Sequence, residues 1–491
     1  MQISFGGIHE SQYARLFTTC QKYLSAFSPC SEYCGKRCVV PATLPLSLSH
    51  HTNIFSDTDK TDIKCTIHIV SDTIDILTLK VQPDGSRMPR KKTTSEPENP
   101  FRVGGVVTKP FFTDRVKECA SVRKALTEPQ AHLLMFGPRR MGKTSVLKVV
   151  HEGLEKKGVP VLFADLSTAT ALTDVTTRLL QSATRVLGRK WRDAATVLFE
   201  RIRVGLRLEH DPVTGMVLPS VDVALREADL DTQRRSLASA LEAIQSLAES
   251  KKAQVGLILD EFQELHRFGG ADAEWHLRGI IQQQTHVGYV LAGSDERLIG
   301  AMLGEGRAFY GMLDTLFVGP IEGAHIAGWI EHRCADSGVN AEGFGTEIVE
   351  LAGPRTRDIV QLARVMFELA RPAGVADGST VSEAFAQIIQ AGDALHRALW
   401  ERLSPLQQNV LRAAAVANTG LTTKATSNRF NLGAPGAASK ALQTLVARDI
   451  LVKTGSSYEF DNPFHRGWVV LNTLPDLGIN LPTTHLPRDR S

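Results

Sequence analysis

The chain has 491 residues, of which 43% are hydrophobic and 22% are charged, and its formal net charge is +3. This length is too great for one hydrophobic core, and the composition is that of folded multi-domain proteins. The small net charge neither demands nor excludes a nucleic-acid partner. No apolar run approaches the ~20 residues of a membrane span and the N-terminus lacks a secretory signal, so we expect a cytoplasmic protein with no membrane partner.

Residues 1–98 differ in character from the rest of the chain. They are rich in serine, threonine and cysteine and show no extended helical periodicity. Within them, residues 65–81 alternate apolar and polar side chains, which predicts a hairpin. Residues 85–100 are typical of a linker. We interpret this region as an N-terminal extension and linker of undefined function.

The cysteines of this extension raise the question of a metal site. Cys30, Cys34 and Cys38 precede His50 and His51 in the sequence. Their spacing differs from that of C-x2-C zinc sites, and a fourth ligand is not indicated. Reduced, unpaired thiols and a zinc site both remain open, and the spacing favours the thiols.

A glycine-flanked loop follows the strand candidate at residues 133–136 and leads into a helical pattern. Its residues are Gly137, Pro138, Arg139, Arg140, Met141, Gly142, Lys143, Thr144 and Ser145. Loop N–H groups and the positive end of the helix dipole would face a polyphosphate, Lys143 would add a cation, and the Thr144 hydroxyl can coordinate Mg²⁺. The pattern predicts a nucleotide-binding P-loop.

A second apolar run, residues 255–259, is followed by two carboxylates, Asp260 and Glu261. A short apolar run of this kind suits a central parallel strand. Asp260 would then orient Mg²⁺ and its waters, and Glu261 would polarise the attacking water. The alternative is a strand that ends in a solvated acidic turn, and the upstream loop favours the nucleotide site.

Three more apolar runs complete the predicted sheet, at residues 161–164, 289–292 and 315–318. Five strands separated by helical stretches predict an α/β fold with a parallel, doubly wound sheet and ligand at the carboxyl ends of the strands. Ser294 follows one of these runs and is a candidate to bridge the γ-phosphate and the attacking water. Small polar residues at such positions also serve turns, so both interpretations stand.

Four ordered motifs carry a family resemblance. They are Asn99-Pro100-Phe101, Phe111-Phe112-Thr113-Asp114-Arg115, the loop at residues 136–145, and the strand end at residues 259–265. In this order they resemble the archaeal-type P-loop ATPases of the STAND and AAA+ assemblage. The likeness runs from Asn99 to Val470 and implies an AAA+-like core with helices on both faces of the sheet.

The resemblance implies ATP and Mg²⁺ as ligands and ATP hydrolysis as the reaction. Lys143, Ser294 and Glu261 match catalytic positions, and Thr144 with Asp260 match the Mg²⁺ site. Phe112 and Arg115 match a box near the adenine, and Phe112 fits a core position equally well. Arg139 and Arg140 match a pair of arginines that is common in this loop of the family, and the alternative is that they form ion pairs with neighbouring acids.

Two places depart from the family pattern. Residues 309–312 read Phe-Tyr-Gly-Met where the family often has Tyr-Gly-Arg, so a sensing arginine is absent there. Arg297 and Arg307 are possible substitutes or surface residues. Further on, Arg355 and Arg357 occupy a position like that of a nucleotide-sensing arginine in the lid of related ATPases, where family members often carry other residues.

Residues 402–472 have the pattern of a winged helix-turn-helix. Ser404 is the expected N-cap of a first helix, with Pro405 at its first position and Gln407 completing a capping box. The next expected elements are helices at residues 422–430 and 436–448, a hairpin at residues 450–460, and a closing segment at residues 461–468 that resembles a family signature.

This C-terminal domain offers few basic contacts for DNA. Its outward candidates are Lys424, Arg429, Lys440, Arg448 and Lys453. Because DNA affinity comes chiefly from phosphate neutralisation, about six basic contacts would be comfortable. DNA binding through residues 402–472 and a protein-docking role therefore both remain open.

We expect five regions in chain order: the extension at 1–98, a P-loop ATPase core at 99–320, a helical lid at 321–401, the winged helix at 402–472 and a tail at 473–491. The sequence predicts a signalling or regulatory ATPase that uses Mg-ATP binding and slow hydrolysis as a conformational switch. The alternatives are a DNA-binding initiator or transcriptional regulator with ATP as conformational ligand, and a nucleotide-binding scaffold without turnover. A homo-oligomer and an unidentified protein client remain open.

Overall fold

The computed structural model describes residues 98–190 and 228–484, the strands at 206–210 and 217–221, and four two-residue strands near the N-terminus. The chain divides into a unit at residues 1–94 and a unit at residues 95–491. In the first unit, β1 (Gln2–Ile3) pairs with β3 (Ile54–Phe55), and β2 (Val39–Val40) pairs with β4 (Leu77–Thr78). The predicted hairpin at residues 65–81 and the cysteine and histidine cluster otherwise lie outside the described residues.

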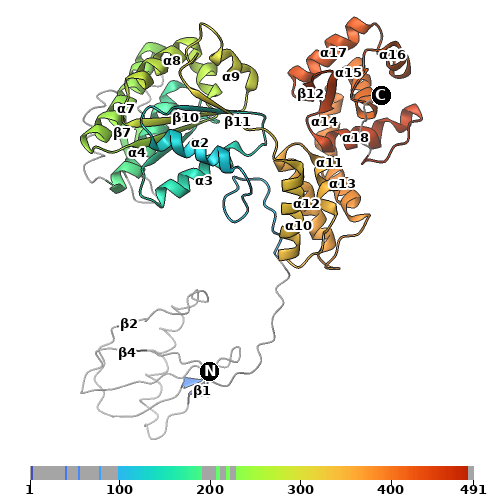
Figure 1. The fold of residues 1–491 in the computed structure, drawn as a ribbon, viewed down its shortest axis with the longest axis horizontal. Coiled ribbons are helices and arrows are strands. Elements are labelled where there is room, and N and C mark those ends of the chain that lie inside the picture. The colour runs from blue at the N-terminus through green and yellow to red at the C-terminus, as the bar shows by residue number, and fades with distance from the viewer. Residues whose placement is uncertain are drawn as a thin grey trace. The chain divides into compact units, whose positions relative to one another are not determined.

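The second unit is built around a five-stranded parallel sheet (Figure 1). Its strands, in the order in which they lie side by side, are β11 (Asp314–Phe317), β5 (Leu133–Phe136), β10 (Val287–Gly293), β9 (Val255–Asp260) and β6 (Val161–Asp165). All four neighbouring pairs run parallel, so their carboxyl ends meet at one edge. The predicted strands and the doubly wound α/β P-loop fold are confirmed.

Helices cover both faces of this sheet because successive strand side chains point to opposite sides. Leu133 and Met135 pack beneath α2 (Val116–Thr127) and α3 (Lys143–Glu155). Leu134, between them, joins the core on the other face. That face is covered by α4 (Leu172–Lys190), α7 (Leu230–Ser250) and α8 (Gln263–Gln283), with α9 (Glu296–Leu303) at its end.

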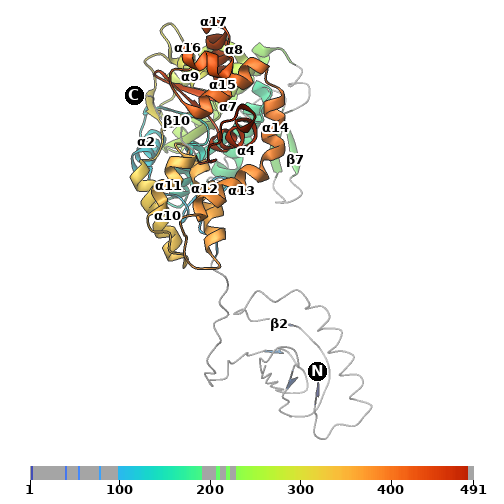
Figure 2. The same cartoon turned by 90° about the vertical axis from the view of Figure 1, so that its right-hand side faces the viewer.

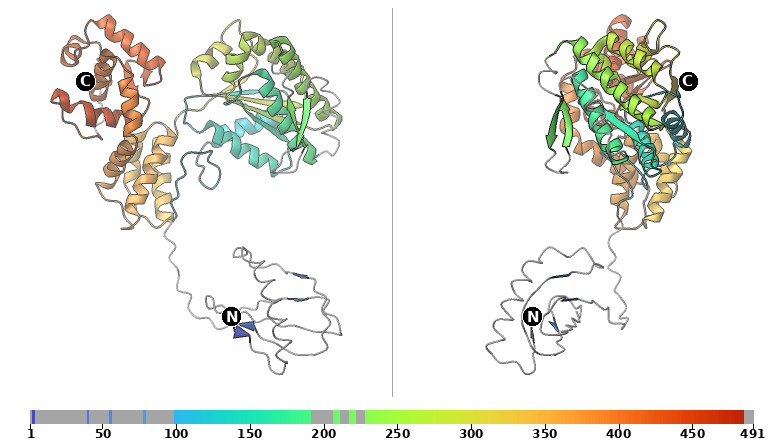
Figure 3. Two further views of the ribbon diagram at one scale, coloured as in Figure 1. Left: turned by 180° about the vertical axis from the view of Figure 1, so that it is seen from behind. Right: turned by 90° about the vertical axis from the view of Figure 1, so that its left-hand side faces the viewer.

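A small antiparallel pair lies beside this layer. Strands β7 (Leu206–His210) and β8 (Val217–Val221) pair from Leu206 with Val221 to His210 with Val217. Strand β8 contacts α4, which places the pair at the β6 side of the fold (Figure 3). Sequence reasoning did not predict this hairpin.

A bundle of helices follows the last strand of the sheet (Figure 2). Its members are α10 (Gly323–Asp336), α11 (Phe344–Ala352), α12 (Thr356–Ala370), α13 (Thr380–Ala391) and α14 (Asp393–Glu401). The buried residues of α12 include Ile359, Leu362, Ala363 and Met366, whose spacing places them on one face of the helix. The helices therefore bury one common apolar core.

Three helices and a hairpin come next, in the predicted order. They are α15 (Pro405–Val416), α16 (Lys424–Phe430), α17 (Pro435–Ala447), β12 (Leu451–Thr454) and β13 (Ser457–Phe460). The capping box forms as expected, because the Ser404 hydroxyl accepts from Gln407 N while the Gln407 side chain accepts from Ser404 N. Helical periodicity in residues 436–448 predicts Ala437, Ala441, Leu442 and Leu445 on the inner face of α17. The last three are buried, but Ala437 is exposed and Ala438 is buried in its place.

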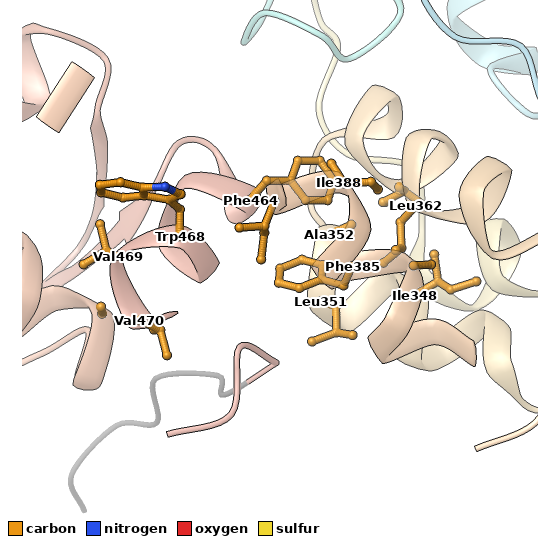
Figure 4. Packing of buried hydrophobic residues seen from close by; sticks show 14 of the residues in the cluster. Ile348, Leu351, Ala352, Leu362, Phe385, Ile388, Phe464, Trp468, Val469 and Val470 are labelled. Atoms are coloured by element: carbon orange, nitrogen blue, oxygen red, sulfur yellow. The ribbon is translucent and has the colours of Figure 1, made fainter. Parts of the chain in front are cut away.

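The final long helix, α18 (Pro463–Thr473), joins the C-terminal elements to the bundle, and the turn η1 (Pro475–Leu477) follows it. Phe464 of α18 packs on Phe385 of α13 with ring centroids 5.4 Å apart (Figure 4). Trp468, one turn later, is buried in the same core. Gly467 lies so close to α13 that a Cβ there would approach Ile389 Cδ1 to 2.5 Å. Movement of α18 therefore requires repacking of the bundle.

No helix among the described residues is both long and apolar enough to cross a membrane.

Candidate functional site

The P-loop crosses the carboxyl edge of the sheet between β5 and α3. Gly137 has a φ of +148°, and a Cβ at this position would lie 2.4 Å from the carbonyl oxygen of Val318, so only glycine fits. Gly142 has a φ of +94° and is the N-cap of α3, with no side-chain cap on that helix start. The positive end of the α3 dipole therefore lies at the loop.

Lys143 opens α3 and is buried, as a phosphate-binding lysine of this loop would be. Its Nζ donates to the carbonyl oxygens of Gly137 and Pro138, each at 2.7 Å. These bonds hold the ammonium group across the loop. The Lys143 side chain therefore extends into the space that the loop encloses.

The next residue meets the carboxylate at the end of β9. Thr144 Oγ1 donates to Asp260 Oδ2 at 2.8 Å. Asp260 is almost fully buried, and burial is the main cause that raises its pKa to about 6, with Glu261 and Asp165 adding to the rise. A hydroxyl and a carboxylate in contact beside a phosphate loop are suitable oxygen ligands for Mg²⁺, directly or through water. The residues therefore fit the ion that the sequence implies.

Glu261 is held by two neighbours. Its Oε2 accepts a 2.7 Å hydrogen bond from Ser294 Oγ and a 2.5 Å bond from Gln263 Nε2. Gln263 Oε1 in turn accepts from Ser294 N at 3.2 Å. The backbone of Glu261 has a φ of +54°, an uncommon conformation for a residue other than glycine, which turns its side chain away from the strand direction.

Gln263 is a site residue that sequence reasoning missed. It belongs to the motif at residues 259–265, but no role was assigned to it. Its side chain is fully buried and closes the triangle with Glu261 and Ser294. The signal available in the sequence was a polar residue two positions after the acidic pair, at the start of a helix.

The two loop arginines point to different partners. Arg139 Nε lies 3.5 Å from Ser294 Oγ, beside Glu261. Arg140 turns the other way, and its guanidinium donates to both carboxylate oxygens of Asp358 at 3.1 Å and to Asp461 Oδ2 at 2.5 Å. Its φ of +72° is again in the left-handed region.

A cavity of about 550 Å³ brings most of these residues together. Lys143, Thr144, Glu261 and Ser294 line it on the sheet side. Its apolar lining comes from a strap ahead of α2 and from the helical bundle, and includes Val106, Phe111, Phe112, Ile326, Trp329 and Val360. A polar end beside an apolar end is suitable for the phosphates and base of one nucleotide.

The loop residues from Arg139 to Gly142 also line this cavity, as do Arg115, Ser145 and Arg357, each with different contacts. Arg115 is buried, and its Nη2 donates to the carbonyl oxygens of Met141 at 3.1 Å and Gly319 at 2.6 Å, which fastens the loop to the end of the sheet. Ser145 Oγ accepts from Val107 N at 3.1 Å and so holds the strap. Arg357 is exposed, and its backbone N donates to Arg140 O at 3.3 Å.

The other candidate arginines are engaged elsewhere. Arg307 Nη2 pairs with the fully buried Glu274 at 3.2 Å, and Arg297 Nη2 donates to Val446 O of α17 at 3.2 Å. Arg355 Nη1 donates to Arg139 O at 2.7 Å, and the same guanidinium pairs with Asp461. None of these three lines the cavity. Within residues 98–190 and 228–484, no cluster of three or more histidine, cysteine, aspartate or glutamate residues suits a metal.

The sheet and this loop define a P-loop nucleotide-hydrolase fold. Residues 112–311 match the family described as an ATPase domain predominantly from Archaea, so the chain carries an archaeal-type P-loop ATPase domain. The predicted family and the predicted enzyme class, an ATPase, are confirmed over this domain. Among curated proteins, none matches the chain significantly.

Several solved structures are similar to this chain. The Walker-type ATPase PABY2304 of Pyrococcus abyssi is 16% identical, with a TM-score of 0.52 over 75% of this chain and 99% of its own. The ORC2 protein of Aeropyrum pernix, in ADPNP and ADP complexes, is 14% identical, with a TM-score of 0.44 over 77% and 98%. The ORC1 protein of the same organism, in complex with DNA, is 15% identical, with a TM-score of 0.38 over 74% and 92%. The first of these likenesses shows the fold alone.

Proposed function

We propose that this chain is a Mg²⁺-dependent ATP switch, in which ATP binding and slow hydrolysis change the position of the elements that follow the sheet. The observation that carries the proposal is the meeting of Lys143, Thr144, Glu261 and Ser294 around one cavity that also has an apolar end. A phosphate chain fits the first end and a base fits the second.

ATP binding would begin at the loop. The positive end of the α3 dipole and the Lys143 ammonium would hold the β- and γ-phosphates, and Thr144 with Asp260 would hold Mg²⁺. When bound, Mg²⁺ supplies positive charge that offsets the charge of the phosphates. Phe112, together with the other apolar residues of the cavity, would contact the adenine.

Hydrolysis would depend on the group around Glu261. Its carboxylate, oriented by Ser294 and Gln263, is in a position to accept a hydrogen bond from a water molecule and align it with the γ-phosphate. Arg139, beside Ser294, would add positive charge where negative charge is redistributed in the transition state. The chain thus offers an arginine in the loop itself for a role that residues 309–312 do not supply.

The switch would act through three parts of the second unit. We assign residues 99–320 to the ATPase core, 321–401 to a lid and 402–472 to a winged helix-turn-helix domain. The contacts of Arg140 with Asp358 and Asp461 support this assignment, because they link the loop to the lid and to the C-terminal domain.

The test of the proposed function compares Lys143→Ala with wild-type protein. We expect Lys143→Ala to abolish both binding of a fluorescent ATP analogue and phosphate release, because the loop loses its only lysine. Lys156→Ala, an exposed lysine at the end of the same helix, should behave as wild type. Absence of ATP binding by the wild-type protein, or equal binding by Lys143→Ala, would overturn the proposal.

DNA binding is a second candidate function. Five basic side chains, Lys424, Arg429, Lys440, Arg448 and Lys453, are exposed on the C-terminal domain. If they contact phosphates, wild-type protein will shift a DNA duplex in a salt-dependent manner, and Lys440→Ala combined with Arg448→Ala will weaken the shift. No shift at low salt, or an unchanged double variant, would instead favour a protein-docking surface and leave the client to be found by capture in the ATP-bound state.

A further inference from the structure

A group of four charges, two of them buried, joins the P-loop to two later segments of the chain. Its members are Arg140 in the loop, Arg355 and Asp358 at the start of α12, and Asp461 immediately after β13. Arg140 contacts both acids, and Asp461 contacts both arginines. Two positive and two negative charges balance within the group.

We propose that this group is an ionic latch, by which nucleotide in the P-loop and docking of the C-terminal domain influence one another. The inference rests on the proposed function, because it requires that the loop bind nucleotide. It adds to that function the residues that carry the coupling, and it makes Arg140 a positioning residue of the loop.

The loop end of the latch controls the shape of the loop. Arg140 precedes Lys143 by three residues and adopts the left-handed conformation, with a φ of +72°. Its carbonyl oxygen accepts from Arg357 N at 3.3 Å, and the preceding carbonyl, that of Arg139, accepts from Arg355 at 2.7 Å. Backbone and side chain of the loop are thus both held from outside it. A change in these contacts must change the conformation of the loop around the bound phosphates.

The far end of the latch is fixed to the C-terminal domain. Asp461 N donates to Ile450 O at 3.0 Å, which ties the residue to the hairpin. The next residue, Asn462, caps α18 by accepting from Phe464 N and His465 N. Because α18 packs in the core shared with α11 and α13, Asp461 moves together with the bundle, and a shift of these elements relative to the P-loop moves Asp461 away from Arg140.

Burial makes these contacts sensitive to one another. Asp358 is 1% exposed and Arg355 is 8% exposed, so solvent screens their charges little. Burial raises the pKa of Asp358, while Arg140 and Arg355 act in the opposite direction. Loss of the Arg140 contact would leave the buried Asp358 carboxylate poorly compensated. Because Asp461 pairs with both arginines, the contacts of the group depend on one another.

Coupling of this kind must be reciprocal. If the latch in its docked form favours one nucleotide state of the loop, that nucleotide favours docking of the C-terminal domain by the same factor. Couplings between sites in proteins are typically about 5- to 150-fold in affinity. A static cross-link that only stabilises the fold would show no such dependence on nucleotide.

The experiment uses the full chain and the isosteric variant Asp461→Asn, with Arg140→Ala and the double variant. Two quantities are measured: the affinity for ATP and ADP by fluorescent analogues, and hydrogen exchange of the α17 and β12–β13 backbone with and without nucleotide. Asp449→Asn is the matched control, because Asp449 is exposed in the same domain and already has a φ of +53°, which asparagine tolerates.

We expect wild-type protein to change exchange in the C-terminal domain when nucleotide binds, and Asp461→Asn to remove that response. Asp461→Asn should also alter the affinity for at least one nucleotide by about fivefold or more. The change in affinity in the double variant should be no greater than the larger of the two single-variant changes. Unchanged affinity and a retained response would overturn the latch while leaving ATP binding intact. Failure of the wild-type protein to bind ATP would instead overturn the proposed function.

A variant that is merely less stable must not be mistaken for a broken latch. Thermal melting of each variant separates the two cases, because a static cross-link predicts a lower melting temperature with the nucleotide response retained. That result in Arg140→Ala and Asp461→Asn would also overturn the proposal. Arg140→Lys, which keeps the charge but cannot bridge Asp358 and Asp461 with one planar fork, should show a partial loss of the response.

Discussion

Ser294 Oγ lies 2.7 Å from Glu261 Oε2, although the two residues are 33 positions apart in the sequence. The contact joins the ends of neighbouring strands β9 and β10, where a parallel sheet collects its functional groups. It fixes one oxygen of Glu261 and leaves the other for a ligand. The carboxylate is therefore oriented before any substrate arrives.

This relationship predicts the behaviour of Glu261→Gln. The amide cannot accept a proton from the attacking water, so phosphate release should fall on the order of 10²-fold or more. Affinity for ATP should change little, because Glu261 does not hold the phosphates. Single-turnover phosphate release and ATP-analogue titration measure the two effects. Glu264→Gln, which alters a surface pair with Arg267, is the control, and full activity in Glu261→Gln would remove Glu261 from the mechanism.

Gln263 should act through Glu261 rather than on ATP. In Gln263→Ala the Glu261 carboxylate loses the hydrogen bond from Gln263 Nε2, and Ser294 N loses its acceptor. We therefore expect turnover to fall by about tenfold while the affinity for ATP is preserved. A loss of melting temperature alone, with normal turnover, would assign Gln263 to stability.

Arg139 and Arg140 should give different phenotypes despite being adjacent. Arg139 lies beside Ser294 and should help to distinguish ATP from ADP. Arg139→Ala should therefore lower turnover and bring the affinities for ATP and ADP closer together. Its exposed side chain makes loss of stability small. Comparison of ATP and ADP titrations with those of Arg140→Ala checks this. Equal ratios in Arg139→Ala and wild-type protein would contradict the assignment.

The sequence was sufficient for features that depend on short-range chemistry. The strands, the P-loop and the capping box at Ser404 each follow from local periodicity or from a spacing of a few residues. The meeting of Thr144 with Asp260 could also be expected, because parallel strands bring their carboxyl ends to one edge. In these cases local pattern and tertiary fold agree.

Other parts of the site depend on contacts that no local pattern encodes. Arg140 meets Asp358 and Asp461 across 218 and 321 positions of sequence, and nothing near either acid marks it as a partner. Gln263 reads as an ordinary polar residue at a helix start until its burial is known. The exposed Ala437 shows a finer limit, because helical periodicity could not separate it from the buried Ala438 beside it.

Acid should destabilise the packing of α14 against α18 through two buried histidines. His465 Nδ1 lies 3.3 Å from His396 Nδ1, and His465 stacks on Trp468 with an angle of 9°. Burial, with a smaller contribution from His396, lowers the pKa of His465 to about 3, and burial also lowers the pKa of His396. Asp393 is a further titratable neighbour of this pair. It opposes the lowering of the His396 pKa, and its carboxylate accepts a hydrogen bond from Trp468 Nε1.

The sign of the effect depends on where the protons bind. Below about pH 6.5 the unfolded chain binds protons at these histidines while the folded chain resists them, so stability present above pH 6.5 is lost as the pH falls toward 3. Each pH unit costs at most about 1.4 kcal/mol per histidine. Melting curves between pH 7.5 and 5.5 should show the loss, and His465→Phe should flatten it. His332→Gln, on the exposed face of α10, is the control, and an unaltered slope in His465→Phe would contradict the explanation.

Arg307 should prove to be a structural residue rather than a sensor of the γ-phosphate. It pairs at 3.2 Å with Glu274, a fully buried acid of α8 whose other partner is His266. Removing one partner of a buried charge costs about 3–5 kcal/mol, and the partial exposure of Arg307 lowers the expected loss for Arg307→Ala to about 1–3 kcal/mol. Denaturant unfolding measures this loss.

The same variant should leave ATP turnover per folded molecule close to that of wild type, because Arg307 does not line the nucleotide cavity. Arg267→Ala, which breaks the pairs of an exposed arginine with Glu264 and Asp295, should change stability by less than about 1 kcal/mol and serves as the matched arginine control. If Arg307→Ala instead lowered turnover strongly while the unfolding midpoint stayed fixed, Arg307 would have to reach the phosphates in a conformation other than this one. The pairing with Glu274 makes that movement costly, since it would leave Glu274 with only the His266 contact in the interior of the domain.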